Sequence, residues 1–347
     1  MRSARLLVLS ATLAAVALLS TACGSGSEGG DTGTDGASSA ASFPVTIKHV
    51  YGETTIEKKP ERVATVAWAN HEVPLALGVV PVGMAKATWG DDDGNGVLPW
   101  VQEKLTALGA RTPVLFDETD GIDFEAVADT RPDVILATYS GITQEDYDKL
   151  SKIAPTVAYP KVAWGTTYQE MIRISSQALG LQAEGDALVA DLEKQVSDSF
   201  AKYPQLAGKK MAFTYIDPKK MSEIGYYTSL DTRPGFLAST GMQHAKVVAD
   251  GSAGTTEFYK TISSEKADEF DDVDVFITYG DAQGNGVKAI QADPLIGKIP
   301  AVRSGAVAVF ADSTPLAASA NPSPLSIPWG IDDYFALIAA AADKGKA

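Results

Sequence analysis

The chain of 347 residues has almost no cysteine and little histidine, and both shortages exclude kinds of site. Its one cysteine, Cys23, has no partner for a disulfide within the chain. The three histidines, His49, His71 and His244, stand far apart, with no spacing typical of a zinc or haem site. The sequence therefore predicts no metal held by protein ligands and no resident cofactor.

Signatures of catalysis and of nucleotide binding are also absent from the part expected to fold. It contains no G-x-G-x-x-G, no phosphate-loop pattern and no G-x-S-x-G elbow. Spacing alone leaves a Ser/His/Asp triad open, so an exported hydrolase is the alternative to a binding protein. The stretch Asp91–Gln102 matches part of a calcium loop, but Gln102 replaces the bidentate glutamate and Pro99 interrupts the next helix. We interpret it as a polar loop and leave calcium open.

Positive charge is scarce. The chain has 29 Lys and Arg against 44 Asp and Glu, a formal net charge of −15. Such a surface repels nucleic acid and anionic lipid, so no nucleic-acid partner is expected. Acidity also leaves room for a basic partner.

The N-terminus has the layout of a secretory signal. Arg2 and Arg5 give a positive start, Leu6–Leu19 an apolar stretch, and the small residues Ser20–Ala22 precede Cys23. The apolar stretch is too short to span a bilayer stably. Export is therefore predicted.

The segment Leu19–Cys23 resembles the lipobox of bacterial lipoproteins, in which the cysteine becomes the first residue and is acylated. This implies a signal peptide over 1–22 and a lipid anchor on Cys23 at the extracytoplasmic face of the cell membrane. Residues 24–42 are all small or acidic, so 23–42 is predicted to be the lipidated cysteine and a flexible tether. The folded part begins near Phe43.

Beyond the tether, short apolar runs rich in β-branched residues alternate with helical stretches, which predicts parallel sheets of buried strands. Ala183–Tyr203 repeats apolar residues at every fourth position and predicts one long amphipathic helix. We expect two α/β lobes, over 43–163 and 209–347, joined by a helical segment over 164–208. The strands are expected at Arg62–Ala67, Val79–Ala85, Pro113–Phe116, Asp133–Thr138, Pro155–Tyr159, Lys210–Ile216, Asp274–Tyr279 and Ala306–Phe310.

The two halves of the sequence share a similar segment. Ile122–Gly141 and Ile262–Asp281 each read as a short helix with a glutamate in its first turn, then an apolar strand, then tyrosine. Carboxylates are favoured at helix N-termini, so compensation of the helix dipole or capping would explain Glu125 and Glu265 separately. As a pair they suggest one acidic group per lobe for two basic pockets of a partner.

The phrases DFEAVADTRPDVILA, YDKLSKIAPTVAY and DPLIGKIPAVRSGAVAVF, together with the lipobox and tether, resemble the substrate-binding lipoproteins of bacterial iron-siderophore ABC importers. The resemblance covers about Val45 to Leu337. It implies an α/β fold of the class III periplasmic-binding-protein type, with two Rossmann-like lobes joined by one long helix and a ligand between them. It also implies that Glu125 and Glu265 dock on the importer's permease. Haem or cobalamin binders of the same fold are the alternatives.

A ferric siderophore encloses its iron in its own oxygens, so the protein needs no metal ligands and no chemical step, and a monomer is expected. Aromatic rings after strand ends would cover the chelate. Only eight arginines are present, which disfavours a strongly anionic tris-catecholate and favours a neutral or weakly charged chelate, such as a ferric hydroxamate. Trp100 and Trp164 are assigned to the structure. The predicted ligand-binding residues are Trp68, Lys86, Trp89, Tyr139, Tyr226, Tyr227, Arg233, Tyr279 and Trp329.

Overall fold

The computed structural model describes residues 42–281 and 283–345. The predicted signal peptide, the lipid anchor at Cys23 and nearly all of the predicted tether lie outside these residues. None of the described helices has the length and apolar character needed to cross a membrane. The predicted domain boundaries remain predictions.

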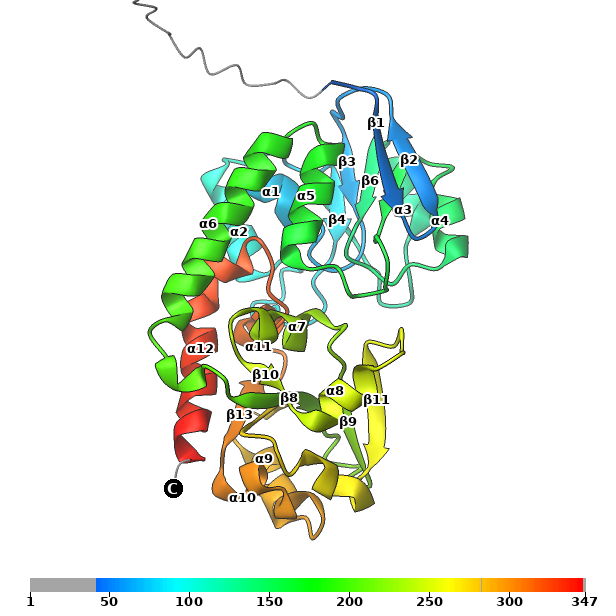
Figure 1. Cartoon of the computed structure of the whole chain (residues 1–347). Coiled ribbons are helices and arrows are strands. Elements are labelled where there is room, and N and C mark those ends of the chain that lie inside the picture. Colours follow the sequence, from blue (N-terminus) through cyan, green and yellow to red (C-terminus); the bar gives the residue numbers. More distant parts are fainter. Residues whose placement is uncertain (1–41, 282, 346–347) are drawn as a thin grey trace, which may run out of the picture. The chain divides into compact units, whose positions relative to one another are not determined.

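The first lobe contains a five-stranded parallel sheet. It is the upper lobe in Figure 1, where its strands are coloured from blue to green. The three strands at the centre and one edge are entirely buried, as expected of a parallel sheet covered on both faces. The predicted strands are confirmed, although that over 79–85 is shorter, since only its end pairs. The strands, in spatial order, are β5 (Val114–Phe116), β4 (Gly83–Ala85), β3 (Val63–Thr65), β6 (Val134–Ala137) and β7 (Thr156–Ala158).

Alternation along β6 sends neighbouring side chains to opposite faces. Ile135 packs with Val127 and Leu150, which come from two helices on one face. Leu136 packs on the other face with Ile47, from an N-terminal antiparallel hairpin that the sequence did not predict. These surrounding elements are β1 (Val45–His49), β2 (Gly52–Ile56), α1 (Glu72–Ala76), α2 (Pro99–Ala107), α3 (Phe124–Asp129), α4 (Gln144–Leu150) and α5 (Tyr168–Ala178).

The second lobe contains a mixed sheet. Its strands β8, β12 and β13 are parallel, as predicted, but two antiparallel strands, β9 and β11, extend it and were missed. Strand β9 reads EIGYY, and its glycine weakens the sequence pattern that predicts a strand. Glycine fits at position 225 because a Cβ there would clash with the Tyr259 hydroxyl. The strands are β11 (Tyr259–Ser263), β9 (Glu223–Tyr227), β8 (Lys210–Tyr215), β12 (Val275–Gly280) and β13 (Val307–Ala311), with β10 (Gln243–His244) pairing with β8.

Aromatic rings fill the core on one side of this second sheet. Phe213 stacks on Phe310 with ring centroids 5.9 Å apart, and Phe310 contacts Tyr334 at 5.2 Å. The remaining short helices of this lobe are η1 (Pro204–Leu206), α7 (Thr232–Ser239), α8 (Lys246–Ser252), η2 (Ser264–Phe270), α9 (Asn285–Ala292), η3 (Ile296–Lys298), α10 (Pro300–Ser304) and α11 (Pro315–Ser319).

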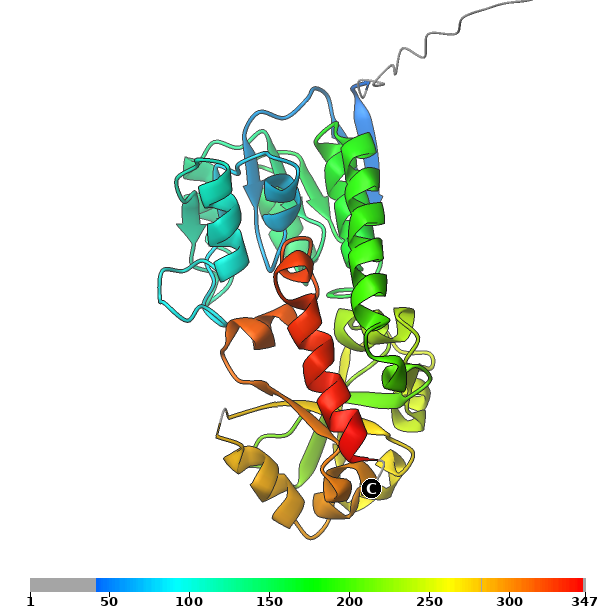
Figure 2. The ribbon, with the colours of Figure 1, turned by 90° about the vertical axis from the view of Figure 1, so that its left-hand side faces the viewer.

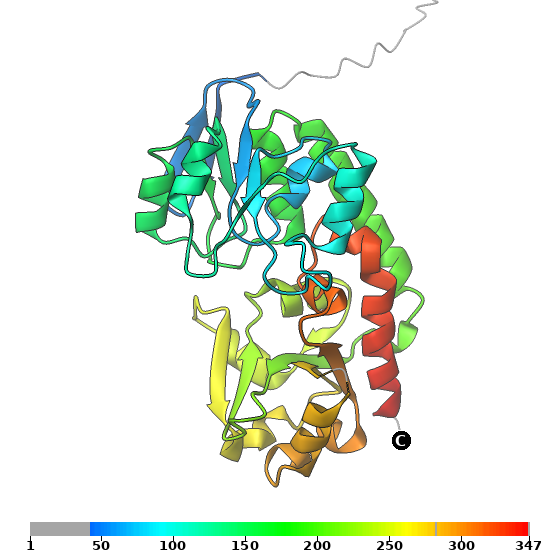
Figure 3. The ribbon, with the colours of Figure 1, turned by 180° about the vertical axis from the view of Figure 1, so that it is seen from behind.

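Two long helices, rather than the one predicted, lie on the same side of the molecule, one mainly beside the first lobe and the other mainly beside the second. The predicted helix is confirmed as α6 (Gln182–Phe200), and α12 (Ser326–Lys344) lies beside it (Figures 1 and 2). Seen from behind, both follow the same side of the two lobes (Figure 3). Asp332 of α12 accepts hydrogen bonds from Lys202 Nζ at 2.7 Å and from the Ser199 hydroxyl, so the two helices are tied together.

The chain also returns to the first lobe just before α12. Glu72, at the start of α1, is fully buried there and accepts a hydrogen bond from the Leu325 N–H at 2.9 Å. Its other oxygen accepts from Trp100 Nε1 at 2.8 Å, and the Trp100 ring packs on Trp329 at 5.0 Å. Burial raises the pKa of Glu72 to about 7, against these hydrogen bonds, which favour the ionised form. The junction between the lobes therefore holds a titratable group.

Replacement of this acid is expected to change how stability depends on pH. A carboxyl group whose pKa is raised on folding contributes stability below its unfolded pKa of about 4.5, and this is lost as pH rises through about 7. The free energy of unfolding of wild type minus that of Glu72→Gln should therefore rise by up to about 3 kcal/mol as the pH is lowered from about 7.5 to 4.5. Urea unfolding of both proteins across this range measures it.

Neighbouring His71 acts in the opposite sense, because burial lowers its pKa to about 4 and acid destabilises a histidine that is held neutral. It is present in both proteins, so its contribution cancels in the difference. A difference that stays constant across this range would show that Glu72 is ionised to the same extent in the folded and unfolded chains.

Candidate ligand-binding site

A cavity of about 310 Å³ lies between the two lobes. Most of its lining is aromatic, with a few polar groups among the rings, which is the composition of a site for a largely apolar ligand. The first lobe supplies Trp68, Trp89, Tyr139 and Trp164, and the second supplies Tyr227, Asp231, Arg233, Phe258, Tyr279, Ala317, Ala318 and Asn321.

The loop that carries Trp68 follows β3 directly and has an unusual backbone. Ala67 and Ala69, on either side of the tryptophan, both have positive φ, at 62° and 61°. Non-glycine residues adopt this region at a cost, so surrounding contacts must hold them there. One such contact is the hydrogen bond from the Ala67 N–H to a Glu118 carboxylate oxygen at 2.9 Å.

Buried Asn70 ties this loop to the end of β6. Its amide nitrogen donates to the carbonyl oxygens of Val66 and Tyr139 at 2.7 and 2.8 Å, and its oxygen accepts from the Tyr139 N–H at 3.0 Å. Trp68 and Trp89, which follow neighbouring strands, face each other with ring centroids 6.5 Å apart. The first lobe thus presents its aromatic groups from the carboxyl ends of its strands, where parallel sheets place ligands.

Arg233 is the one cation in the lining. Its guanidinium lies 4.5 Å from the centre of the Tyr227 ring, and its Nε donates to the Tyr279 hydroxyl at 2.9 Å. Nη1 donates to both oxygens of Asp231, at 2.9 and 3.1 Å. The arginine side chain is 19% exposed and that of Asp231 only 1%. The cation is therefore held flat against a ring and paired with a carboxylate that solvent does not reach.

The tyrosines of the cavity are neutral at ordinary pH. Burial raises the pKa of Tyr139 to about 12, and it also raises the pKa values of Tyr227 and Tyr279. Their hydroxyls remain hydrogen-bond donors. Among the described residues that line the cavity, the charged groups are Asp231 and Arg233, and their charges cancel.

Hydrogen bonds cross between the lobes beside the rings. The Tyr139 hydroxyl, from the first lobe, accepts from Asn321 Nδ2 at 2.8 Å and lies 3.3 Å from the Thr232 hydroxyl. Trp89 Nε1 donates to Asp312 of the second lobe at 3.2 Å. Side chains that line the cavity therefore also hold the lobes in their present arrangement.

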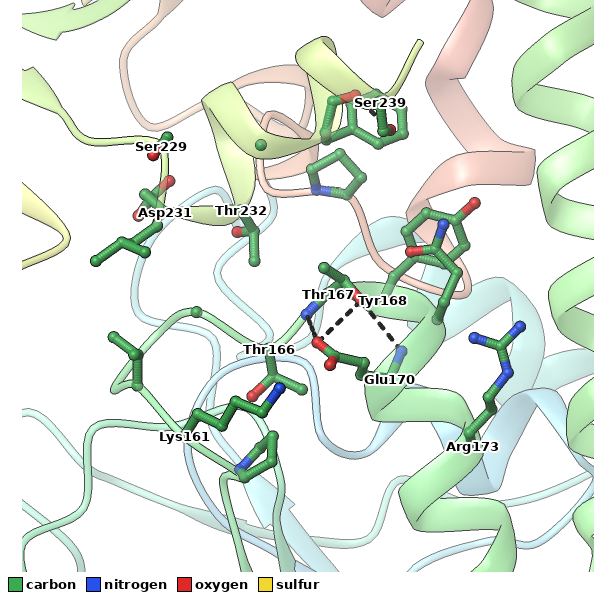
Figure 4. Close-up of a pocket in the computed structure, with 18 of the residues that line it drawn as sticks. Lys161, Thr166, Thr167, Tyr168, Glu170, Arg173, Ser229, Asp231, Thr232 and Ser239 are labelled. Atoms are coloured by element: carbon green, nitrogen blue, oxygen red, sulfur yellow. Dashed lines mark hydrogen bonds between the residues drawn. The ribbon is translucent and has the colours of Figure 1, made fainter. Parts of the chain in front are cut away.

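A second, larger cavity of about 480 Å³ lies behind Asp231, between the loop after β7 and helix α7. Figure 4 shows its hydroxyl groups, including those of Thr166 and Thr232, on opposite sides of the gap. Two of its polar groups serve to cap α5, because the Glu170 N–H donates to the Thr167 hydroxyl and the Thr167 N–H donates back to the Glu170 carboxylate, each at 3.2 Å. Few aromatic rings face it, so the aromatic cavity is the better ligand site.

Six of the nine predicted ligand-binding residues come together in the aromatic cavity: Trp68, Trp89, Tyr139, Tyr227, Arg233 and Tyr279. Tyr226 lies elsewhere. It is next to Tyr227 on β9, so its side chain points to the opposite face of the sheet, where it packs against Phe270 at 6.1 Å. We withdraw it from the proposed site.

Lys86 and Trp329 also lie outside the cavity. Lys86 is exposed and pairs with Asp117 at 3.4 Å. Trp329 packs on Trp100 and lines a separate surface groove beside the 91–98 loop and the start of α2. Lys86 follows β4 as predicted, but its side chain lies at the surface, whereas Trp329 is not on a loop at all and lies in the first turn of α12. Trp100 itself is 3% exposed and belongs to the core, as assigned.

Sequence reasoning missed several lining residues. Trp164 was assigned to structure, yet it lines the cavity with its ring against Tyr139 at 5.3 Å. The signal was present, because Trp164 follows a predicted strand, as Trp68 and Trp89 do. Phe258 precedes β11, which was not predicted, and Asp231 and Asn321 carry no local pattern that points to a ligand.

The paired glutamates are both exposed. Glu125 lies in the first turn of α3 and Glu265 in that of η2, where the side chains of Asp123 and Ser263 already provide the N-caps. Capping therefore does not account for the glutamates, and the favourable interaction of a carboxylate with the helix dipole stays as the alternative to docking. Neither makes an ion pair with another described residue, and their role in docking remains a prediction.

The predicted polar loop is shorter than expected, because Pro99 does not interrupt the next helix but begins it as the first residue of α2, where its fixed φ is favourable. Residues 91–98 form the loop, which uses its polar groups internally. Asp91 accepts hydrogen bonds from the N–H groups of Gly94 and Gly96 at 3.0 and 2.6 Å, and Asn95 closes the turn that follows. Among residues 42–281 and 283–345, no group of three or more His, Cys, Asp or Glu side chains could hold a metal ion.

Comparison with known proteins decides the family. The family model described as "Periplasmic binding protein" matches residues 63–314, which include both sheets. The chain belongs to the periplasmic binding protein family. The fold and family predicted from the sequence are thereby confirmed, and this periplasmic binding protein can be set beside its solved relatives.

Two solved structures resemble this periplasmic binding protein along most of its length. PiaA of Streptococcus pneumoniae TIGR4, crystallised in complex with ferrichrome, is 46% identical, with 86% of this chain and 99% of PiaA covered at a TM-score of 0.82. A periplasmic solute binding protein of Mycobacterium smegmatis is 27% identical, with 86% and 98% covered at a TM-score of 0.69.

A curated relative matches over a shorter stretch. The Bacillus subtilis protein named "Probable siderophore-binding lipoprotein YfiY" is 31% identical over 156 residues. The chain spans 44% of the length of that relative, and the same share of this periplasmic binding protein is aligned.

Proposed function

We propose that this protein is an extracytoplasmic lipoprotein that captures a ferric siderophore, of hydroxamate type, between its lobes and delivers it to an ABC importer. The observation that carries the proposal is the aromatic cavity, whose two charges cancel and which holds no cluster of metal-ligating side chains among the described residues. Such a lining suits an iron atom that arrives enclosed by its chelator. No chemical step is required, so the protein is not an enzyme.

The relatives support this ligand class. PiaA, at 46% identity, was crystallised with ferrichrome, which is a neutral ferric tris-hydroxamate, and YfiY is named for siderophore binding. A neutral chelate also matches the neutral lining, because an ion buried without a counter-charge loses its hydration without compensation.

In this proposal the rings of Trp68, Trp89 and Tyr227 cover the apolar surface of the chelate. Arg233 uses Nε and Nη1 for Tyr279 and Asp231, and its Nη2 has no partner within the described part of the chain. It can donate to an oxygen of the chelate. The tyrosine hydroxyls offer further donors at the edge of the iron centre.

Delivery rests on residues outside the cavity. The lipid on Cys23 holds the protein, as a monomer, at the extracytoplasmic face of the membrane. Glu125 and Glu265, one in each lobe, engage basic groups of the permease. Their exposure and their lack of ion pairs within the described residues support this role.

Titration with ferrichrome tests the proposal. Three tryptophans line the cavity, so ferrichrome should quench the protein's fluorescence saturably at one chelate per protein, whereas a ferric tris-catecholate, haem and cobalamin should bind much more weakly. Calorimetry with the same ligands gives an independent stoichiometry. If haem or cobalamin bound more tightly than ferrichrome, the proposed ligand would be wrong and the tighter one would take its place in the proposal.

The exported hydrolase is tested separately. Panels of ester and glycoside substrates should show no turnover by the purified protein. Turnover together with a lack of binding to every iron chelate would overturn the proposed function.

A further inference from the structure

Asp231 stands in the wall of the aromatic cavity without being available to the ligand. Its side chain is 1% exposed, and both of its oxygens accept from Arg233 Nη1, at 3.1 and 2.9 Å. One oxygen also accepts from the Arg233 N–H at 2.9 Å. The carboxylate is therefore committed to the arginine and acts on a ligand through its charge.

We propose that Asp231 is a specificity-determining residue that sets the net charge of the cavity to zero, so that the site takes neutral ferric chelates and rejects anionic ones. The inference rests on the proposed function, since it assumes that the cavity binds a ferric chelate. It adds the residue that selects among chelates.

The geometry limits how the cavity can respond to a charged ligand. Arg233 is held by Tyr227, Tyr279 and Asp231 on three sides, so it has little freedom to turn from its carboxylate toward another anion. A chelate with three negative charges would lie close to the Asp231 carboxylate in a cavity lined mostly by aromatic rings. Repulsion between like charges is strong where the dielectric constant is low.

The opposite arrangement would also be unfavourable for a neutral ligand. Without Asp231, a neutral chelate would leave the guanidinium buried among rings with no counter-charge. Two other acidic groups lie near the rings. Asp312 is exposed to solvent, which screens its charge, and accepts from Trp89, while Glu118 accepts from the Ala67 N–H, so neither pairs with Arg233. The Asp231 carboxylate is thus the group that pairs the cation.

A structural role for Asp231 is also present, because it is the N-cap of α7. Figure 4 shows Asp231 on the loop before α7, beside Ser229 and Thr232 and next to the second cavity. The test must therefore keep the cap while removing the charge. Asparagine does both, since it caps helices about as well as aspartate.

The experiment compares wild type with Asp231→Asn by titration with ferrichrome and with a ferric tris-catecholate at low and high salt. The ratio of the affinity for the anionic chelate to that for the neutral one should rise about tenfold or more in the variant, and the rise should shrink with added salt. The matched control is Asp123→Asn, which changes the corresponding N-cap of α3 and should leave the ratio unchanged.

Arg233→Gln provides a second variant, which leaves the carboxylate alone in the cavity and should move the ratio about tenfold in the opposite direction. An unchanged ratio in folded Asp231→Asn, or shifts of the same sign in both variants, would overturn the inference and leave Asp231 as a helix cap. Binding of neither chelate by wild type would instead contradict the proposed function, so the two failures are distinguishable.

Discussion

Arginine in place of both Glu125 and Glu265 is expected to abolish uptake of the ferric siderophore while its affinity for the purified protein stays within about twofold of wild type. Both side chains are exposed, and neither lines the cavity. If they meet basic pockets of the permease, reversal puts like charges face to face at two points of one interface. Transport of radioactive ferrichrome in cells, with calorimetry on the purified variant, separates docking from binding.

The control must change the net charge by the same amount. Glu103→Arg with Asp333→Arg does so at two exposed helical positions, one on α2 and one on α12, and should leave uptake near the wild-type rate. Equal loss of uptake in the control would attribute the effect to overall charge. Loss of ligand affinity in the Glu125 and Glu265 variant would contradict a role confined to docking.

Truncation of a cavity ring is expected to weaken ligand binding strongly. Trp68→Ala or Tyr227→Ala removes an aromatic surface that covers the chelate, a loss of about 2 kcal/mol of binding free energy or roughly a 30-fold higher Kd. Tyr227→Ala also removes the ring on which the Arg233 guanidinium lies, so its effect should be the larger of the two. Fluorescence or calorimetric titration with ferrichrome measures the change.

Trp329→Ala is the matched control for Trp68→Ala. It removes the same side chain at a position that packs on Trp100, away from the cavity, so Kd should change less than about twofold. A larger effect at Trp329 than at Trp68 would place the ligand in the surface groove beside the 91–98 loop and the start of α2. Thermal melting of both variants reports whether either loss comes from unfolding.

The parallel strands could be predicted because a strand buried on both faces is a run of apolar residues, as in Val134–Ala137. The antiparallel strands could not. The hairpin of β1 and β2 alternates buried with exposed residues over only five positions on each side, and β9 contains a glycine. Their pairing partners, rather than their own composition, make them strands.

The site residues that follow strand ends could be predicted from the sequence. Those whose position depends on strand register or on a partner side chain could not. Trp68, Trp89 and Tyr139 come from the same edge of one parallel sheet, so a single rule finds them. Tyr226 and Tyr227 differ by one position, and only the register of β9 decides which of them faces the cavity. Asp231 gains its importance from Arg233, which sequence alone does not show to be buried against it.

The paired helices α6 and α12 bear on how the importer distinguishes a full carrier from an empty one. Two helices joined through Asp332 resist bending more than a single helix would. Ligand binding should therefore change the conformation of the protein only slightly. If Glu125 and Glu265 dock on the permease, their separation would then be almost the same with and without a bound ligand. Unloaded molecules should therefore occupy the transporter as well, and an excess of them should slow iron import by competition.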